Sequence, residues 1–344
     1  MAIPGKEVRG VRVVVLGGGN GTSRVLKALL PLLHEEKIAS LHALVHMADD
    51  GGSSGRLRAQ YAVGSMGDLT RCLLALSRLR GDIRGERFIR ALEYRFASGD
   101  FRGHTLRNAL LAALELTSDL DAAVATFARI LQIPKYAGAF PTTLTPLTQQ
   151  VELAGEILGS GQHHISWNVD LQAKDTTKPG DVVVTFAEGK VQLNPRAVDV
   201  LKVATHIIVA PGHTYGTILP TLASLQPHRN LEKLLADKKL VVLMTLLTTP
   251  KQTSQWSGED FVRVYESYLG RSVDIVIGNT GMAKVDLVSG QDWVQFTEKD
   301  HPYQLLQENI VSTEEQAAQT GDTVPRAVVV HDEDKIRQIF TSHL

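Results

Sequence analysis

The sequence predicts an α/β fold: a doubly wound, mainly parallel sheet with helices on both faces. Three observations predict it. Short apolar strands alternate with amphipathic helices along most of the chain. The strands are nearly continuously apolar, which is typical of parallel strands buried on both faces. Several of them run directly into turns that contain glycine, where α/β proteins hold their ligands.

The strands are predicted from apolar runs that end in glycine, proline, aspartate or threonine. They lie at about residues 11–16, 41–48, 206–210, 240–246 and 273–277, with a last strand at 326–330. The helices are predicted from apolar residues at three- and four-residue intervals. They cover about residues 22–33, 67–79, 86–96, 105–116, 121–131 and 332–340. This repeated strand and helix order indicates one layered sheet.

Two tracts depart from the alternation. Residues 145–194 contain short alternating segments broken by glycine, which predict a small antiparallel, β-rich insertion. Residues 281–325 are rich in polar residues with weak periodicity, so we expect irregular structure there. Residues 1–10 are expected to form a flexible tail. The rest of the chain, residues 11–344, is expected to fold as a single domain.

The composition excludes several classes of protein. The chain has 344 residues, of which 43 % are hydrophobic, and a net charge of −1, so it gives no overall attraction to nucleic acid. Its single cysteine, Cys72, lies in an apolar helical pattern, where a buried and inert thiol is expected. No apolar run is long enough to span a membrane. We therefore expect a cytoplasmic protein without membrane insertion.

The first predicted strand runs into a cluster of glycines and then into a helix. This arrangement presents backbone N–H groups and the positive end of a helix to an anion. The spacing fits neither the dinucleotide fingerprint G-x-G-x-x-G nor the phosphate loop G-x-x-x-x-G-K-[ST]. The candidate ligand-binding residues here are Gly18, Gly19, Asn20, Gly21 and Thr22.

A second polar cluster follows the next predicted strand and should face the same ligand. Its candidates are Asp50, Gly51, Gly52, Ser53 and Ser54. If Asp49 and Asp50 continue the strand, their side chains point to opposite faces, so only one reaches the ligand. We expect this to be Asp50. Its carboxylate could orient a hydroxyl, hold Mg²⁺ or accept a proton, or it could form turn hydrogen bonds only.

A third loop of this kind follows the strand predicted at 206–210. It contributes Gly212, His213, Thr214 and Tyr215 as ligand-binding candidates. Asp68 and His104 stand at predicted helix starts, where each either caps its helix or contacts the ligand. The arginines of residues 78–107 indicate either a solvated helix face or one or two diphosphate contacts. No histidine pair has the spacing of a zinc site, so we expect no structural metal.

These motifs, in this order, resemble those of the 2-phospho-L-lactate transferase superfamily, and more narrowly its bacterial gluconeogenesis factor branch. The resemblance rests on Gly-Gly-Gly-Asn-Gly, Ala-Asp-Asp-Gly-Gly-Ser-Ser-Gly-Arg, Gly-Asp-Leu, Gly-His-Thr-Leu-Arg-Asn and Pro-Gly-His-Thr-Tyr. It covers roughly residues 11–280 and the last strand and helix. It implies a Rossmann-like fold of three layers. It also adds Asn108 and Thr245 to the candidate ligand-binding residues.

The resemblance implies one of two functions. Members of the gluconeogenesis factor branch bind UDP-sugars and act in carbon metabolism, cell-wall synthesis and cell shape. The transferase branch moves a phospholactyl-type group from a guanosine diphosphate carrier to the deazaflavin precursor of coenzyme F420. That reaction uses Mg²⁺, and the acid that matches Asp50 would hold the metal and be catalytic. The first function is our hypothesis and the transferase is its alternative; for either, the resemblance implies a homodimer.

The chain departs from the family pattern at three places. Asn20 and His213 replace a threonine and a serine of the usual motifs. Residues 244–253 differ from the usual segment that follows the strand. Val330 precedes His331 where an arginine is common. We therefore expect the phosphate loops to be kept and the contacts to the sugar to differ.

Overall fold

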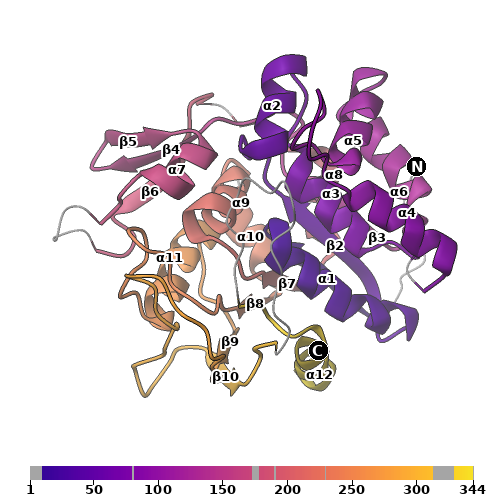
Figure 1. Ribbon diagram of the computed structural model, residues 1–344. Coiled ribbons are helices and arrows are strands. Elements are labelled where there is room, and N and C mark those ends of the chain that lie inside the picture. The colour runs from indigo at the N-terminus through magenta and orange to yellow at the C-terminus, as the bar shows by residue number, and fades with distance from the viewer. Residues whose placement is uncertain are drawn as a thin grey trace.

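The computed structural model describes residues 10–79, 81–172, 178–189, 191–228, 230–312 and 329–343. Its main feature is a sheet of seven parallel strands (Figure 1). The strands are β1 (Val11–Leu16), β2 (Ile38–Val45), β3 (Ala137–Pro141), β7 (His206–Val209), β8 (Lys239–Leu243), β9 (Ile275–Asn279) and β10 (Gln304–Glu308). Their order across the sheet is β10-β9-β8-β7-β1-β2-β3. The predicted doubly wound parallel sheet is confirmed.

The first group of helices follows β1 and β2 in the chain. It comprises α1 (Gly19–His34), α2 (Gly52–Tyr61), α3 (Met66–Ala75), α4 (Ile83–Glu93), α5 (Leu106–Leu116) and α6 (Leu120–Ile130). The second group comprises α8 (Pro195–Val203), the π-helical turn η1 (Thr214–Ile218), α9 (Leu219–Leu225), α10 (Leu231–Leu235) and α11 (Gly258–Leu269). The last helix is α12 (Glu333–His343), which packs against α1.

The strands divide their side chains between two cores. Val13 and Val15 of β1 pack with α1, α3, α5, α6 and α12 on one face of the sheet. Val14 and Leu16 pack with α8, α9, α10 and α11 on the other face. This alternation follows from the two-residue period of a strand, and burial on both faces explains why most positions of the strand are apolar. The three-layer arrangement predicted from the continuous apolar strands is confirmed.

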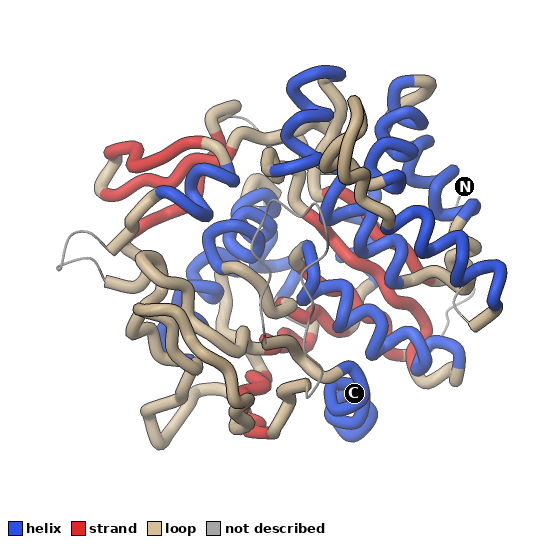
Figure 2. The backbone as a smooth tube through the Cα atoms, viewed as in Figure 1, coloured by secondary structure: helices blue, strands red, loops and turns tan. Residues whose placement is uncertain are grey.

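The antiparallel insertion is also confirmed. Three strands, β4 (Gln149–Leu153), β5 (Glu156–Ser160) and β6 (Val182–Phe186), pair antiparallel in the order β5-β4-β6. A short helix, α7 (Gln162–Asn168), lies between β5 and β6 in the chain. This small sheet lies at one end of the molecule, away from α4, α5 and α6 (Figures 1 and 2).

Several elements differ from the prediction. No helix was predicted over residues 52–61, which form α2. Its buried side chains are two serines and only one leucine, so the sequence shows no apolar helical pattern there. β3 was not predicted, since its sequence AGAFP lacks branched residues. β10 lies within the tract expected to be irregular and is a half-exposed edge strand. Residues 326–328 of the predicted last strand lie outside the described residues, and residues 329–330 are not in a strand.

The sheet has one point at which its winding reverses. From β1 the chain moves outward to β2 and β3, then returns to β7 on the other side of β1. All strands are parallel, so the turns after β7, β1 and β2 lie side by side at the carboxyl edge. Ligands of open α/β sheets bind at such a reversal. None of the described helices is both long and apolar enough to cross a membrane.

Candidate functional site

The turn after β1 brings the N-terminus of α1 to the carboxyl edge. Gly19 begins the helix with φ +67°, a conformation that suits glycine. Gly21 lies against the neighbouring turn: a Cβ atom there would be 1.8 Å from the carbonyl oxygen of Pro211. Among the described residues, no side chain caps this helix and no acid lies in its first turn. Its N–H groups and positive end are thus unopposed by the helix's own side chains.

Thr22, in the first turn of α1, is fully buried. Its hydroxyl has no hydrogen-bond partner within the described part of the chain. It lies beside Gly17, where a Cβ atom would be 2.6 Å from Oγ1 of Thr22. An unsatisfied buried hydroxyl costs about 1–3 kcal/mol, a cost that a bound group could offset.

His213, in the turn after β7, has a fixed tautomer. Its Nδ1 accepts a hydrogen bond of 2.9 Å from the backbone N–H of Gly216, so the neutral ring carries its proton on Nε2. Burial lowers the pKa of His213 to about 4, so the imidazole is uncharged at neutral pH. Nε2 is shielded from solvent and has no partner among the residues described. The turn therefore holds a neutral hydrogen-bond donor.

The two aspartates after β2 point to different partners. Oδ1 of Asp50 accepts a 2.7 Å hydrogen bond from the backbone N–H of His163, at the start of α7. Oδ1 of Asp49 accepts one of 3.0 Å from Gly51. Burial, and after it the negative charge of Asp68, raises the pKa of Asp49. Because β2 ends at Val45, both aspartates lie in the loop, and strand alternation does not set their directions.

Asp68 and Arg71, on α3, lie beside the glycine turn. A Cβ atom on Gly18 would be 2.5 Å from Oδ2 of Asp68, and one on Gly19 would be 3.7 Å from Nη1 of Arg71. Nη1 of Arg71 is 3.8 Å from Oδ1 of Asp68. Burial favours a raised pKa for Asp68, but His46 and Arg71 outweigh it and hold the pKa below its usual value. Asp68 is the ionised partner of the Asp49–Asp68 pair.

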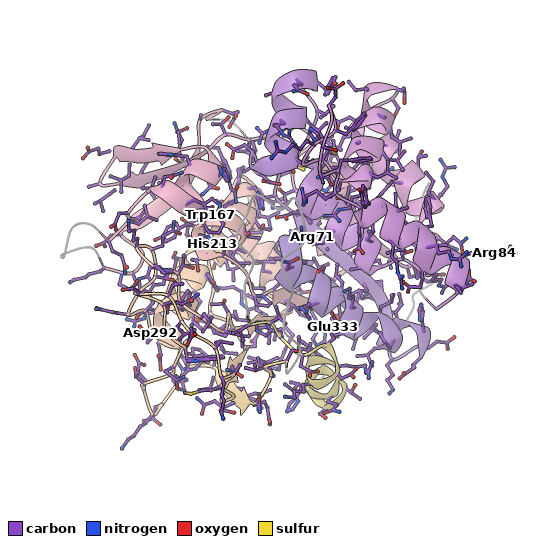
Figure 3. The ribbon with its side chains drawn as sticks, viewed as in Figure 1. Arg71, Arg84, Trp167, His213, Asp292 and Glu333 are labelled. Atoms are coloured by element: carbon purple, nitrogen blue, oxygen red, sulfur yellow. The ribbon has the colours of Figure 1, made fainter. Side chains whose placement is uncertain are left out.

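Arg71 was missed by the sequence analysis. It is one-quarter exposed and brings a positive charge to the start of α1. The signal that could have found it is its spacing, since a residue three positions after Asp68 lies on the same face of a helix. Figure 3 shows Arg71 toward the middle of the molecule and Arg84 at its far edge.

Four predicted residues form one buried network rather than separate contacts. Oγ of Ser53 lies 2.9 Å from Nδ1 of His104, and it accepts a hydrogen bond of 3.2 Å from the amide of Asn108. The amide oxygen of Asn108 accepts a 2.9 Å bond from Thr70. Oγ of Ser54 accepts a 2.9 Å bond from the N–H of Gly67. The network joins α2, α3 and the start of α5 behind the carboxyl edge.

The inserted α7 lies across these turns. Besides the bond from His163 to Asp50, the amide of Gln162 donates to the carbonyl of Gly216 at 2.7 Å. The amide of Gln252, which follows β8, donates to the carbonyl of Ile165 at 2.8 Å. The hydroxyl of Ser166 is buried and has no partner in the described segments. A helix that the sequence analysis did not identify is thus tied to the turns after β2, β7 and β8.

The remaining candidates lie at the same edge in different roles. Gly51 is the residue that precedes α2, and Gly52 begins it. Asn20 is the second residue of α1 and accepts a hydrogen bond from Ser23 on its carbonyl. Tyr215 is 1 % exposed and packs in the second core, and Thr214 is 2 % exposed. Thr245 follows β8 and is half-buried. Because the side chain of Tyr215 is buried in this core, we expect Tyr215 to contact a ligand only through its backbone.

Mg²⁺ in proteins is held by one or two carboxylates together with phosphate oxygens of the substrate. Asp68 supplies such a carboxylate beside the glycine turn and has Asp49 as its neighbour, whereas the Asp50 carboxylate is turned toward α7. No group of three or more histidine, cysteine, aspartate or glutamate side chains in the described ranges could hold a metal ion by itself. A metal here would need oxygen ligands from the bound molecule.

Comparisons with known proteins show the family and the fold of the chain. The profile of the family "2-phospho-L-lactate transferase CofD" matches residues 13–322. A gluconeogenesis factor of Listeria monocytogenes is 32 % identical over 83 % of this chain and 82 % of its own length. That of Bacillus subtilis is 28 % identical over 78 % of each chain. A solved UPF0052 family protein of Bacillus halodurans shares the fold, with a TM-score of 0.78 at 22 % identity over 97 % of this chain and 99 % of its own.

Proposed function

This chain belongs to the 2-phospho-L-lactate transferase CofD family, and on that premise we propose that it binds a nucleoside diphosphate, first of all a UDP-sugar. The family name implies a small nucleotide ligand. The diphosphate would lie on the start of α1, between the turns after β1, β2 and β7. Gly18, Gly19, Asn20 and Gly21 would offer N–H groups, and Arg71 a charge-assisted bond.

One observation carries this proposal: buried polar atoms without partners gather at the sheet reversal. Oγ1 of Thr22, Nε2 of His213 and Oγ of Ser166 each lack a hydrogen-bond partner among the described residues. They belong to the turn after β1, the turn after β7 and the inserted helix α7, which is bonded to the turn after β7. Buried polar groups are nearly always hydrogen-bonded in folded proteins, and a ligand at this glycine-lined edge would give these three atoms partners, which supports the proposal. Other buried atoms without partners, such as Nδ1 of His228 and the hydroxyl of Tyr303, belong to other parts of the described chain.

The proposed role follows the names of the relatives. They are called gluconeogenesis factors. We propose that this protein acts in the regulation of carbon metabolism in the cytoplasm, and, following the resemblance of its motifs, in cell-wall synthesis and cell shape as well. The bound nucleotide sugar would serve as the signal. This proposal includes no chemical step.

The transferase alternative depends on Mg²⁺ and on Asp50. No specific contact favours it, because the carboxylate of Asp50 already accepts a hydrogen bond from α7. Asp68 lies beside Gly18 and has Asp49 as a neighbouring carboxylate, and the two would hold a metal together with diphosphate oxygens. Release of guanosine monophosphate that requires both Mg²⁺ and Asp50 would establish the alternative.

A thermal-shift measurement tests the proposed binding. Ligand present at about 100 times its dissociation constant stabilises the folded state by roughly 2.7 kcal/mol. For a chain of 344 residues this corresponds to a rise in Tm of about 4 °C. We expect such a rise with UDP-N-acetylglucosamine and with UDP. The absence of a rise with every nucleoside diphosphate up to millimolar concentration would contradict the proposal.

Two arginine variants sharpen this test. Arg71→Ala removes the positive charge beside Gly19, so we expect the dissociation constant of UDP to rise about 10- to 100-fold. Arg84→Ala is the matched control, because Arg84 is exposed on α4 at the far edge of the molecule (Figure 3). It should bind as the wild type does. Equal affinities for the two variants would remove Arg71 from the site.

A further inference from the structure

The side chain of Trp167 is exposed in a way that the fold does not require. Trp167 lies on α7 and is 45 % exposed, whereas Trp256 is 7 % exposed and packs in a core. Its ring lies beside the imidazole of His213, with centroids 6.2 Å apart and planes at 49° (Figure 3). The pair stands where the inserted helix meets the turn after β7. An exposed indole at a ligand-binding edge is a surface on which a flat ring can stack.

The position of Trp167 is fixed by contacts of its helix. Just before it in the chain, the carbonyls of Ile165 and Ser166 accept hydrogen bonds of 2.8 Å and 3.3 Å from the amide of Gln252. At the start of the helix, the backbone N–H of His163 donates to Asp50. The indole is therefore carried on a segment that is anchored to the turns after β2 and β8, and its stacking face needs little ordering when a ligand binds.

The surroundings of Trp167 differ from those of the glycine turn. At the glycine turn, the positive charge of Arg71 lies beside Gly19 together with the ionised carboxylate of Asp68, so this part of the edge is charged. His213, next to Trp167, is uncharged at neutral pH and offers an N–H on Nε2. The Trp167–His213 pair brings no positive charge to a phosphate, whereas a ring with carbonyl acceptors matches both the indole face and the N–H donor. The edge thus has a charged part and an uncharged aromatic part.

We propose that Trp167 stacks on the nucleobase of the bound nucleoside diphosphate, with the N–H of His213 as the donor to an acceptor on that base. This inference rests on the proposed function and deepens it, because it fixes the direction of the ligand. The diphosphate lies at the start of α1 beside Arg71, and the base lies under α7. Stacking on an aromatic side chain is tolerant of base identity, so the discrimination between bases falls to hydrogen bonds.

The test compares two ligands in one variant. Trp167→Ala removes the stacking surface, so we expect the dissociation constant of UDP to rise about 10- to 100-fold. The affinity of inorganic pyrophosphate, which has no base, should stay within about twofold. Trp167→Phe keeps an aromatic ring and should recover most of the affinity for UDP. Isothermal titration calorimetry on the full chain measures all three.

Two controls accompany the test of Trp167. Tyr136→Ala removes an aromatic side chain that is 48 % exposed directly before β3, at the opposite edge of the sheet, and should leave both affinities unchanged. UDP should also quench the tryptophan fluorescence of the wild type, and Trp167→Phe should lose this quenching while Trp256 and Trp293 remain.

The outcomes separate the inference from the proposed function. If the wild type binds neither UDP nor pyrophosphate, the proposed function fails. If it binds UDP and Trp167→Ala binds UDP equally well, only the stacking inference is overturned. A loss seen for UDP-N-acetylglucosamine but not for UDP would assign Trp167 to the sugar and would equally overturn it.

Discussion

Replacing Gly21 with alanine is expected to lower the free energy of unfolding by about 2–4 kcal/mol and to abolish UDP binding. The new Cβ would lie 1.8 Å from the carbonyl oxygen of Pro211 and 2.8 Å from its carbonyl carbon. Both are backbone atoms, so a side-chain rotation cannot relieve the contact. The turns after β1 and β7 must move apart, and the converging N–H groups would lose their alignment. Urea unfolding and calorimetric titration with UDP measure the two effects.

Gly99→Ala is the matched control for this variant. Gly99 has φ +71°, and a Cβ atom added there would meet no described atom within 4 Å, so only backbone strain of about 1 kcal/mol is expected. UDP affinity should not change. If Gly21→Ala has the same stability and the same affinity for UDP as the wild type, the turns after β1 and β7 are not in close contact at Gly21 and Pro211.

Acidification is expected to destabilise the protein steeply between pH 7 and pH 5. Burial lowers the pKa of His42, His213 and His331 from 6.5 to about 4. Between these two values the unfolded chain binds protons that the folded chain does not, so stability falls as the pH falls. Each histidine contributes roughly 1–2 kcal/mol of loss over this interval, and the three together roughly 3–6 kcal/mol. Urea unfolding at a series of pH values measures the loss.

A difference between variants isolates this contribution, because the raised pKa of Asp49 acts in the opposite direction. His42→Gln removes one titrating group that lies within β2 and is not among the candidate site residues, and its stability should fall by roughly 1–2 kcal/mol less than the wild type between pH 7 and pH 5. His34→Gln alters an exposed histidine and should follow the wild-type curve. If His42→Gln shows the full wild-type loss, His42 is not a buried neutral group.

The parts of the fold that the sequence predicted are those with strong periodicity. β1 was predicted with its observed bounds, because every one of its residues except Arg12 is apolar. α1, α5 and α6 agree with their predictions to within a few residues for the same reason. α2 and β3 escaped detection because local composition opposed their final structure. Packing against the rest of the molecule overrides weak local preference in such segments.

For the candidate site, the sequence predicted which backbone turns come together but not how the side chains are oriented. Glycine turns after apolar strands identify the carboxyl edge, because the topology of parallel sheets requires that the turns meet there. The orientation of Asp50 was not predictable, since it depends on His163 of an insertion more than a hundred residues away. Trp167 belongs to the same insertion, in a tract where the sequence predicted only strands. Side chains brought in by an insertion carry no local signal of the site they join.

A crystal structure with bound UDP-N-acetylglucosamine tests the central claim most directly. We expect diphosphate oxygens about 3 Å from the backbone nitrogens of Asn20 and Gly21, with the guanidinium of Arg71 on the same phosphates and the uracil against Trp167. Ligand density at any other surface, or a diphosphate that makes no contact with the start of α1, would contradict it.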